Sequence, residues 1–365
     1  MEGISRVLRF PCRGLSGLLR RLWPLAALVG LHLLAVVSIS MASGVPFDPA
    51  MSRTLGMLFT ILLPLFGFVL VVRHFLYLAF VLRPARPLAR FLDDLKALAG
   101  DTERIGRGML ALLLIVLFIG GFSHLKSLVP HLNPFSWDAV FAAWDRKLHF
   151  GRAPHEWLQM TVLARPLATT LLNAAYHFWF FLIYFVVVLA CFSPREDTVG
   201  PVFLLAFVLT FAVGGNLLAV LFSSAGPVYY ARLGFGEEFV PLMEMLAAFD
   251  RISPVWALEV QEALWRGHVA GGPLSGISAM PSMHVASATL IALYGARRGR
   301  WWGAASGLFA LAIMVGSVQL GWHYAVDGYA GALLAVVFWC LSARLLGRRR
   351  AAGPARTEKG RAPAG

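Results

Sequence analysis

Two histidines and one aspartate stand where polar loops meet hydrophobic segments near the C-terminal end of the chain. His284 ends the stretch Pro-Ser-Met-His, and both His323 and Asp327 lie in the stretch Gly-Trp-His-Tyr-Ala-Val-Asp-Gly. Asp327 follows His323 by about one helical turn, so the two side chains share a helix face. A carboxylate that holds and polarises an imidazole, with a second imidazole nearby, is a set of groups used in nucleophilic and acid–base catalysis. We therefore treat these three residues as candidate catalytic groups.

The residues just before His284 are suited to holding an anion. Ser282 supplies a hydroxyl where a helix is expected to start, and free backbone N–H groups at such a start attract negative charge. A purely structural role for the two histidines and Asp327 is the competing interpretation. Ionisable groups close to hydrocarbon are costly, however, and generally signal function.

The composition places these groups in a membrane protein. Of the 365 residues, 58% are hydrophobic and 14% are charged, against about 45–50% and about 25% in soluble domains. Apolar runs of about 20 residues recur along the chain, and lipid forces backbone groups to pair within helices. We expect an all-α, polytopic fold. The three cysteines are scattered without the spacing of a zinc site, so neither a disulfide framework nor a metal or other cofactor is expected.

Eight transmembrane helices are expected, and two long loops separate some of them. The sixth span is short for a crossing, which leaves open that it begins inside the preceding loop. The loop 125–166 is expected to hold two amphipathic pieces, and the loop 223–281 two short helices near 237–249 and 254–267. The expected spans are, approximately, 22–42, 55–82, 109–124, 167–191, 201–222, 283–296, 302–318 and 324–346.

The basic residues concentrate on alternate connections between these spans. This is the positive-inside pattern, and it predicts cytoplasmic N- and C-termini. The net charge of +13 is then mostly topological, and no nucleic-acid partner is expected. His284, His323 and Asp327 all begin spans that run from outside to inside, so all three should lie at the outer, periplasmic or lumenal, face. The outer loop 43–54, by contrast, holds only one basic residue, Arg53. The basic residues on the inner side are Arg6, Arg9, Arg13, Arg20 and Arg21; Arg83, Arg86, Arg90, Lys96, Arg104 and Arg107; Arg297, Arg298 and Arg300; and the tail arginines.

The Pro-Ser-Met-His and Gly-Trp-His-Tyr-Ala-Val-Asp-Gly stretches resemble the second and third signatures of the type 2 phosphatidic acid phosphatase superfamily. The resemblance covers residues 107–346 and implies a catalytic membrane domain with a six-helix core. Residues 1–106 would then be a basic segment with two accessory transmembrane helices. Residues 347–365, rich in Arg, Ala, Pro and Gly, are expected to form a disordered cytoplasmic tail.

Two departures from the phosphatase pattern shift the resemblance toward the inositolphosphotransferase branch, which includes the inositol phosphorylceramide synthases. The Lys-x6-Arg-Pro signature is missing, and Gly-Pro-Val-Tyr-Tyr, residues 226–230, stands at the outer end of the fifth span instead. The Ser-Arg pair that precedes the last signature histidine is replaced by Gly316 and Ser317. The resemblance thus indicates a metal-independent enzyme that cleaves or transfers a phosphate-linked lipid headgroup.

The resemblance also implies a role for each candidate residue. His323 would be the nucleophile, Asp327 would orient its other ring nitrogen, and His284 would protonate the leaving alkoxide. With the family arginines absent, the groups that hold the phosphate stay open among backbone N–H groups at 282–284, two tyrosines and several loop arginines. The expected substrate-binding residues are Ser282, Gly226, Pro227, Tyr229, Tyr230 and Arg232, with Arg251 and Arg266 as further candidate bases.

Several alternatives stay open at this point. The acceptor of the phosphoryl group is either a lipid hydroxyl or water, and the substrate is a phospholipid, a sphingolipid or a polyprenyl phosphate or pyrophosphate. A hydrolase of the phosphatidic acid phosphatase type is the nearest alternative. A transporter is disfavoured, because transporters place polar groups near the midplane, often between related halves, and no internal repeat is visible. The oligomeric state is not indicated.

Three further features receive structural interpretations. Asp138 and Asp145, one heptad apart beside tryptophans, are expected on the solvated face of an amphipathic helix. Tyr176 and His177 lie in the fourth span, where packing and substrate binding are equally compatible with the sequence. The isolated histidines are expected to be packing or interfacial residues; they are His124, His131, His149, His155 and His268.

Overall fold

The computed structural model describes residues 12–47, 56–270 and 276–351, and the regular elements in these ranges are all helical. This confirms the predicted all-α class. Parts of two predictions fall outside the described residues. They are the topology argument from Arg6, Arg9 and Arg53, and residues 352–365 of the predicted tail.

Seven helical runs among the described residues are long and apolar enough to cross a membrane. Two of them contain stretches of wider π-helical turns, labelled η1, η2 and η3. The runs are α1 (Cys12–Ser43), η1–α3–η2 (Leu58–Leu62, Leu63–Tyr77, Leu78–Leu82), α5 (Thr102–Leu132), α8 (Pro166–Cys191), α9–η3–α10 (Val199–Leu209, Thr210–Leu218, Ala219–Leu221), α14 (Arg300–Gln319) and α15 (Ala325–Ala351).

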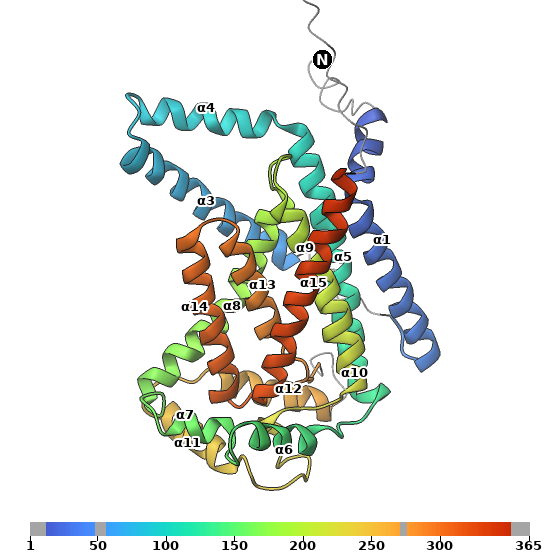
Figure 1. Ribbon diagram of the computed structural model, residues 1–365, viewed down its shortest axis with the longest axis vertical. Helices are drawn as coiled ribbons and strands as arrows, with labels where there is room; N and C mark the ends of the chain where they lie inside the picture. The colour runs from blue at the N-terminus through green and yellow to red at the C-terminus, as the bar shows by residue number, and fades with distance from the viewer. Residues whose placement is uncertain (1–11, 48–55, 271–275, 352–365) are drawn as a thin grey trace, which may run out of the picture.

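The eighth apolar helix, α13 (Met283–Ala296), has 14 residues. Its length of about 21 Å is less than the roughly 30 Å of the hydrocarbon layer. The helix does not begin inside the preceding loop, because Ser282 caps its N-terminus: the Ser282 hydroxyl accepts a hydrogen bond from the Val285 N–H at 3.4 Å. Nine of the 14 residues of α13 are buried, and the helix packs against α14, α15, α9 and α8 at the centre of the bundle (Figure 1).

Three helices extend well beyond the spans that the sequence predicts. α1 begins at Cys12, ten residues before the predicted start at 22. α5 extends the third span at both ends, and its N-terminus is capped by Asp101, which accepts a hydrogen bond from the Arg104 N–H at 3.0 Å. α15 continues to Ala351, past the predicted start of the tail at Gly347. Apolar patterning marks only the part of a helix that lies in hydrocarbon, so it underestimates helices that continue into polar surroundings.

Short helices lie across one end of the bundle, at the bottom of Figure 1. They confirm the short helices predicted in the loops 125–166 and 223–281. At the opposite end, α4 (Pro87–Gly100) runs across the top of the view and joins α3, which leans away from the bundle. The short helices are α6 (Asp138–Leu148), α7 (Pro154–Gln159), the 3₁₀ turn η4 (Pro227–Tyr229), α11 (Val240–Asp250) and α12 (Ala257–Val269).

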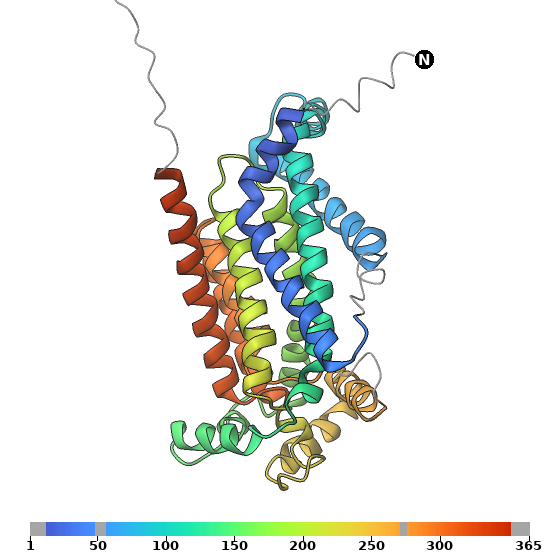
Figure 2. The ribbon, with the colours of Figure 1, turned by 90° about the vertical axis from the view of Figure 1, so that its right-hand side faces the viewer.

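The first helix is tied into the bundle by a polar contact inside the membrane layer. α1 runs alongside α5 (Figure 2), and the His32 Nε2 lies 2.8 Å from the Asn216 Oδ1. The Asn216 amide also donates to the Phe122 carbonyl at 3.2 Å. Both side chains are buried. In the span Leu58–Leu82, by contrast, only 11% of the most apolar 18-residue segment is buried. α3 is therefore peripheral, whereas α1 is part of the packed bundle.

This contact predicts a non-additive effect of mutation. His32→Leu or Asn216→Leu alone leaves a buried polar partner unsatisfied, so each should destabilise the protein by about 0.6–2 kcal/mol. The double variant removes both polar groups and should cost less than the sum of the two single variants. Thermal unfolding of the purified protein in detergent measures all three, and additive changes in Tm would contradict a direct His32–Asn216 interaction.

Candidate active site

The two signature stretches meet through their backbones. The Ser282 N–H donates to the Asp327 carbonyl at 2.9 Å, which joins the start of α13 to the first turn of α15. Gly331, one turn further along α15, allows this approach, because a Cβ there would lie 2.4 Å from the Ser282 carbonyl oxygen. Residues almost fifty positions apart in the sequence are therefore held at one level of the bundle.

The two histidine rings face each other at this junction. Their centroids are 6.0 Å apart with an interplanar angle of 60°. His284 lies in the first turn of α13, and His323 lies in the turn between α14 and α15. The backbone N–H groups of Trp322 and His323 both donate to the Ser317 carbonyl at 3.0 Å. His323 is thus placed by a tight turn, and its side chain is buried.

Asp327 lies beside the His323 ring. Its Oδ2 is 3.4 Å from the His323 Nδ1, longer than a hydrogen bond, and it accepts a hydrogen bond from the Tyr324 N–H at 3.0 Å. The hydrogen bond from Tyr324 is a capping bond: an acid in the first turn of a helix accepts from the backbone N–H of the residue just before that helix. Contacts of this kind are often long without substrate and tighten when it binds. Burial, and secondly the positive charge of Lys126, lower the pKa of His323 to about 3, so its imidazole is neutral at pH 7.

Aromatic side chains from α8 form one wall of the site. The Tyr176 ring stacks on His284 with centroids 4.4 Å apart, and the Trp179 ring lies 4.1 Å from His284. The Trp179 Nε1–H donates to the Ser287 hydroxyl at 2.8 Å. Of the two residues that the sequence left open, Tyr176 contacts a signature histidine, whereas the His177 ring packs against Trp256 at 5.9 Å.

Lys126 is a basic residue of this site that the sequence reasoning missed. It lies near the end of α5, and its aliphatic stem passes Gly276, where a Cβ would be 3.7 Å from the Lys126 Cγ. Its charge acts on both signature histidines. The sequence does contain a signal for Lys126, because a single lysine in an apolar helix indicates function. The predicted span ended at His124, however, so Lys126 was assigned to the loop.

Asp138 and Asp145 are buried, and their predicted placement on a solvated face is wrong. α6 lies against the ends of the transmembrane helices and turns both carboxylates inward. Asp138 accepts hydrogen bonds from the N–H groups of Ala225 and Gly226 at 2.8–3.1 Å, and from the Tyr324 hydroxyl at 2.9 Å. The outward face of α6 carries Trp144, which is 47% exposed. The heptad spacing of the acids therefore marks the buried face of this helix.

Asp145 caps the N-terminus of α15. Its two oxygens accept from the Ala325 N–H at 2.7 Å and the Val326 N–H at 2.9 Å, so it satisfies backbone groups that a helix start leaves unpaired. Burial raises the pKa of its carboxyl to about 6, and the two N–H bonds oppose this shift. The burial of Asp138 likewise raises its pKa. Because Asp327 belongs to the same first turn, Asp145 helps to set its position.

The stretch 226–230 packs against the His323 turn, but its tyrosines face elsewhere. Gly226 has φ +99°, and a Cβ there would lie 2.4 Å from the Trp322 carbonyl oxygen. Pro227 follows it at the buried start of η4. Tyr229 donates its hydroxyl proton to the Gln261 carbonyl at 2.9 Å, and Tyr230 is buried with its ring 5.1 Å from Phe239.

The predicted loop bases are not brought to the histidines. Arg232 pairs with Glu262 at 2.8 Å and lies over the Trp265 ring at 5.5 Å. Arg251 and Arg266 are both exposed, after α11 and on α12 respectively. Ser282 is fully buried, with its hydroxyl engaged in capping α13.

Four of the isolated histidines make packing or polar contacts of their own, as expected. The His268 ring lies 5.6 Å from Trp265 and 5.4 Å from Phe135. His124 lies 3.1 Å from the Ser40 hydroxyl, His149 lies 2.8 Å from the Tyr329 hydroxyl, and the His155 ring packs on Phe239 at 5.2 Å. Within residues 12–47, 56–270 and 276–351, no three His, Cys, Asp or Glu side chains are arranged to hold a metal ion.

The cap formed by Asp145 gives a test of this arrangement. Asp145→Ala should lower stability by about 2 kcal/mol or more, because two backbone N–H groups lose their partner in a buried setting. Asp145→Asn keeps one acceptor and should be intermediate. Thermal unfolding in detergent measures both, with Asp93→Ala as the control, because the Asp93 side chain is 73% exposed. An Asp145→Ala variant as stable as this control would contradict the capping role.

Comparison with known proteins places this architecture in a family. Residues 139–341, more than half of the chain, match the PAP2 superfamily, and the match includes His284, His323 and Asp327. No curated protein and no solved structure matches the chain. The match begins after α5, so the predicted start of a catalytic domain at residue 107 stays a prediction. The chain belongs to the PAP2 superfamily, whose members are membrane phosphatases and phosphotransferases.

Proposed function

We propose that this chain is a lipid phosphatase or phosphotransferase in which His323, Asp327 and His284 carry out the phosphoryl transfer. The observation that carries the proposal is the pair of facing imidazoles, 6.0 Å apart, of which one has a carboxylate 3.4 Å from its Nδ1. A histidine oriented by an acid is the general form of an activated nucleophile. Membership of the PAP2 superfamily supports phosphoryl chemistry as the reaction of this set.

In the first step, His323 attacks the phosphorus atom of the lipid. Its Nδ1 faces Asp327, so we assign the attack to Nε2, which has to leave its contact with the Ala279 backbone when the substrate binds. The lowered pKa of His323 keeps this imidazole unprotonated at pH 7. The Nε2–P bond forms as the P–O bond to the leaving group breaks, and the Asp327 carboxylate stabilises the resulting imidazolium.

His284 supplies the proton that the leaving oxygen needs. His284 enters this step as the imidazolium, which the negative charge of the bound phosphate favours, and it donates the proton to the departing alkoxide as the P–O bond breaks. In the second step, His284 takes a proton from the incoming hydroxyl group, whose oxygen attacks phosphorus while the P–Nε2 bond breaks. Water as acceptor gives a phosphatase, and a lipid hydroxyl gives a phosphotransferase. The stacked Tyr176 and nearby Trp179 rings hold the His284 ring for both steps.

Lys126 provides the positive charge that the transferred phosphate requires. Charge stabilisation in a site that excludes water is a large part of catalysis, and the arginine of the phosphatase signature is replaced here by Ser317. The Lys126 charge acts on both histidines. Backbone N–H groups in the first turn of α13 add to it through the helix dipole. Tyr229 and Arg232, which engage Gln261 and Glu262 instead, contribute by packing rather than by contact with phosphate.

The branch of the family, the side of the membrane and the metal requirement are proposed from the sequence patterns together with this geometry. Gly226 and Ser317 favour a branch like the inositolphosphotransferases over the phosphatidic acid phosphatases. We place the reaction at the outer face and both termini in the cytoplasm, because the basic residues 297–300 lie at the other end of α13. We expect the reaction to require no metal, since two imidazoles and an ammonium supply the acid, the nucleophile and the charge.

The roles of the three reacting groups predict distinct kinetic defects. His323→Ala should abolish turnover, and Asp327→Asn should lower kcat by about 10⁴-fold, since the imidazole loses its partner. His284→Ala should lower kcat by about 10²–10⁴-fold for lipid substrates. With an aryl phosphate, whose leaving group departs without a proton, the same variant should keep most of the rate of the first step, seen as a burst of released phenol, whereas its steady-state turnover should still fall because His284 also acts in the second step. Phosphate release and headgroup exchange, assayed with purified protein, a lipid panel and a chelator, measure these effects.

The control for these variants is His268→Ala, because His268 lies in α12 beside Trp265 and Phe135. It should leave kcat unchanged. Wild-type turnover in His323→Ala or Asp327→Asn, or an equal loss of the first-step rate for alkyl and aryl substrates in His284→Ala, would show that the roles are wrong. Loss of all activity in the chelator would refute the metal-independent mechanism.

The role of Lys126 predicts a charge requirement at α5. Lys126→Met should lower kcat/KM by about 100-fold or more, the loss typical when one oxyanion-stabilising group is removed. Lys126→Arg should retain most activity because it keeps the charge. Lys147→Met, at the same end of the bundle but exposed on α6, serves as the control. Equal kcat/KM in Lys126→Met and wild type would exclude Lys126 as the phosphate-holding group.

A further inference from the structure

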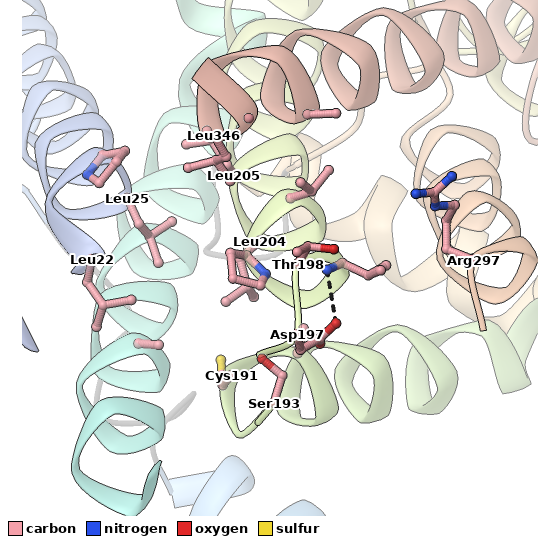
Figure 3. Close-up of a pocket in the computed structure, with 18 of the residues that line it drawn as sticks. Leu22, Leu25, Cys191, Ser193, Asp197, Thr198, Leu204, Leu205, Arg297 and Leu346 are labelled. Atoms are coloured by element: carbon pink, nitrogen blue, oxygen red, sulfur yellow. Dashed lines mark hydrogen bonds between the residues drawn. The ribbon is translucent and has the colours of Figure 1, made fainter. Parts of the chain in front are cut away.

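A cavity lies at the end of the bundle opposite the histidines (Figure 3). Its volume of about 840 Å³ is within the range of about 300–1,000 Å³ found for ligand pockets. Leucines from three separate helices form much of its lining. They are Leu22 and Leu25 of α1, Leu204 and Leu205 of α9, and Leu346 of α15.

The lining of this cavity is also basic. Arg107, Arg195, Arg297 and Arg344 line it, from four different parts of the chain. Asp197 is the one acidic residue among the described lining residues, and its charge is already engaged, because Arg298 donates to it at 2.6 Å. The lining of the cavity thus carries an excess of positive charge.

The four arginines differ in whether an acid within the described residues pairs with them. Arg107 donates to the Ser193 carbonyl, and Arg195 lies 3.6 Å from Glu103. Arg297 and Arg344 form no ion pair with the described part of the chain, and both are exposed. Arg297 lies at the end of α13 and Arg344 near the end of α15, and these two helices are neighbours. The two guanidinium groups can therefore bind the same anion.

We propose that this cavity binds one anionic phospholipid, with its phosphate between Arg297 and Arg344 and an acyl chain against the leucines. Cationic side chains over an apolar lining match the two ends of such a molecule. The lipid would bridge α1, α9 and α15 at a site separate from the histidines. The proposal therefore does not depend on the proposed function.

A cysteine of the chain, Cys340, can be labelled to test whether this cavity is filled. Cys340 lines the cavity and is exposed, whereas Cys191, also in the lining, is buried. In a Cys12→Ser, Cys191→Ser background, the rate at which a maleimide labels Cys340 reports whether the cavity is filled. The experiment uses the full-length protein, stripped of lipid in neutral detergent, with dioleoyl phosphatidylglycerol or dioleoyl phosphatidylcholine added.

We expect phosphatidylglycerol to slow the labelling of Cys340 at lower concentration than phosphatidylcholine does. Arg297→Gln and Arg344→Gln should each weaken this preference by about fivefold, the effect of one basic residue near an anionic lipid. Arg300→Gln is the matched control, because Arg300 lies near the same end of the bundle, over the Trp301 ring and not in the lining. Ala343→Phe, which fills the cavity, should remove protection by either lipid.

Three results would overturn the proposal. Equal protection by both lipids would show an apolar groove without headgroup recognition. A preference that survives in the Arg297→Gln, Arg344→Gln double variant would place the headgroup elsewhere. Faster labelling of a lipid-free chain ending at Ala351 than of the full chain would identify residues 352–365 as the occupant. The comparison of two lipids on the otherwise unmodified chain keeps the test decisive even if a variant fails to fold.

Discussion

The hydrogen bond from the Ser282 N–H to the Asp327 carbonyl holds the centre of this protein together. It joins the first turns of α13 and α15, and it forms only because Gly331 has no side chain to block the approach. Backbone contacts allow little variation in distance, so they position side chains more accurately than long side chains could. His284, His323 and Asp327 therefore meet as a consequence of how two helices begin, before any of the three side chains interacts.

The short helix α6 secures this junction from outside the membrane layer. Asp145 accepts hydrogen bonds from the first N–H groups of α15, and Asp138 holds Ala225, Gly226 and the Tyr324 hydroxyl. Buried carboxylates are tolerated here because several donors converge on each of them. The loop helices are thus structural supports for the transmembrane helix ends, and a lipid headgroup has to approach the site past them.

Charge is distributed differently at the two ends of the bundle. Near the histidines the basic group is Lys126, partly buried on α5, and the surrounding carboxylates are engaged with backbone donors. At the opposite end, arginines surround an open apolar cavity. The first arrangement suits a reaction on a single phosphate held away from water, since an ammonium acts more strongly in a medium of low dielectric. The second suits a lipid that binds without reacting.

The sequence by itself determined the helical spans, the short α13 and the candidate set His284, His323 and Asp327, because hydrophobic runs and helix starts are local signals. It did not determine what a side chain faces. The spacing of Asp138 and Asp145 indicated a helix but not its buried side, and the apolar pattern of α5 ended before Lys126. Tyr229 lies in a signature-like stretch and Arg232 follows it, yet both face α12. Only the tertiary structure decided these cases, because burial and charge pairing depend on contacts between distant segments, and no local pattern encodes them.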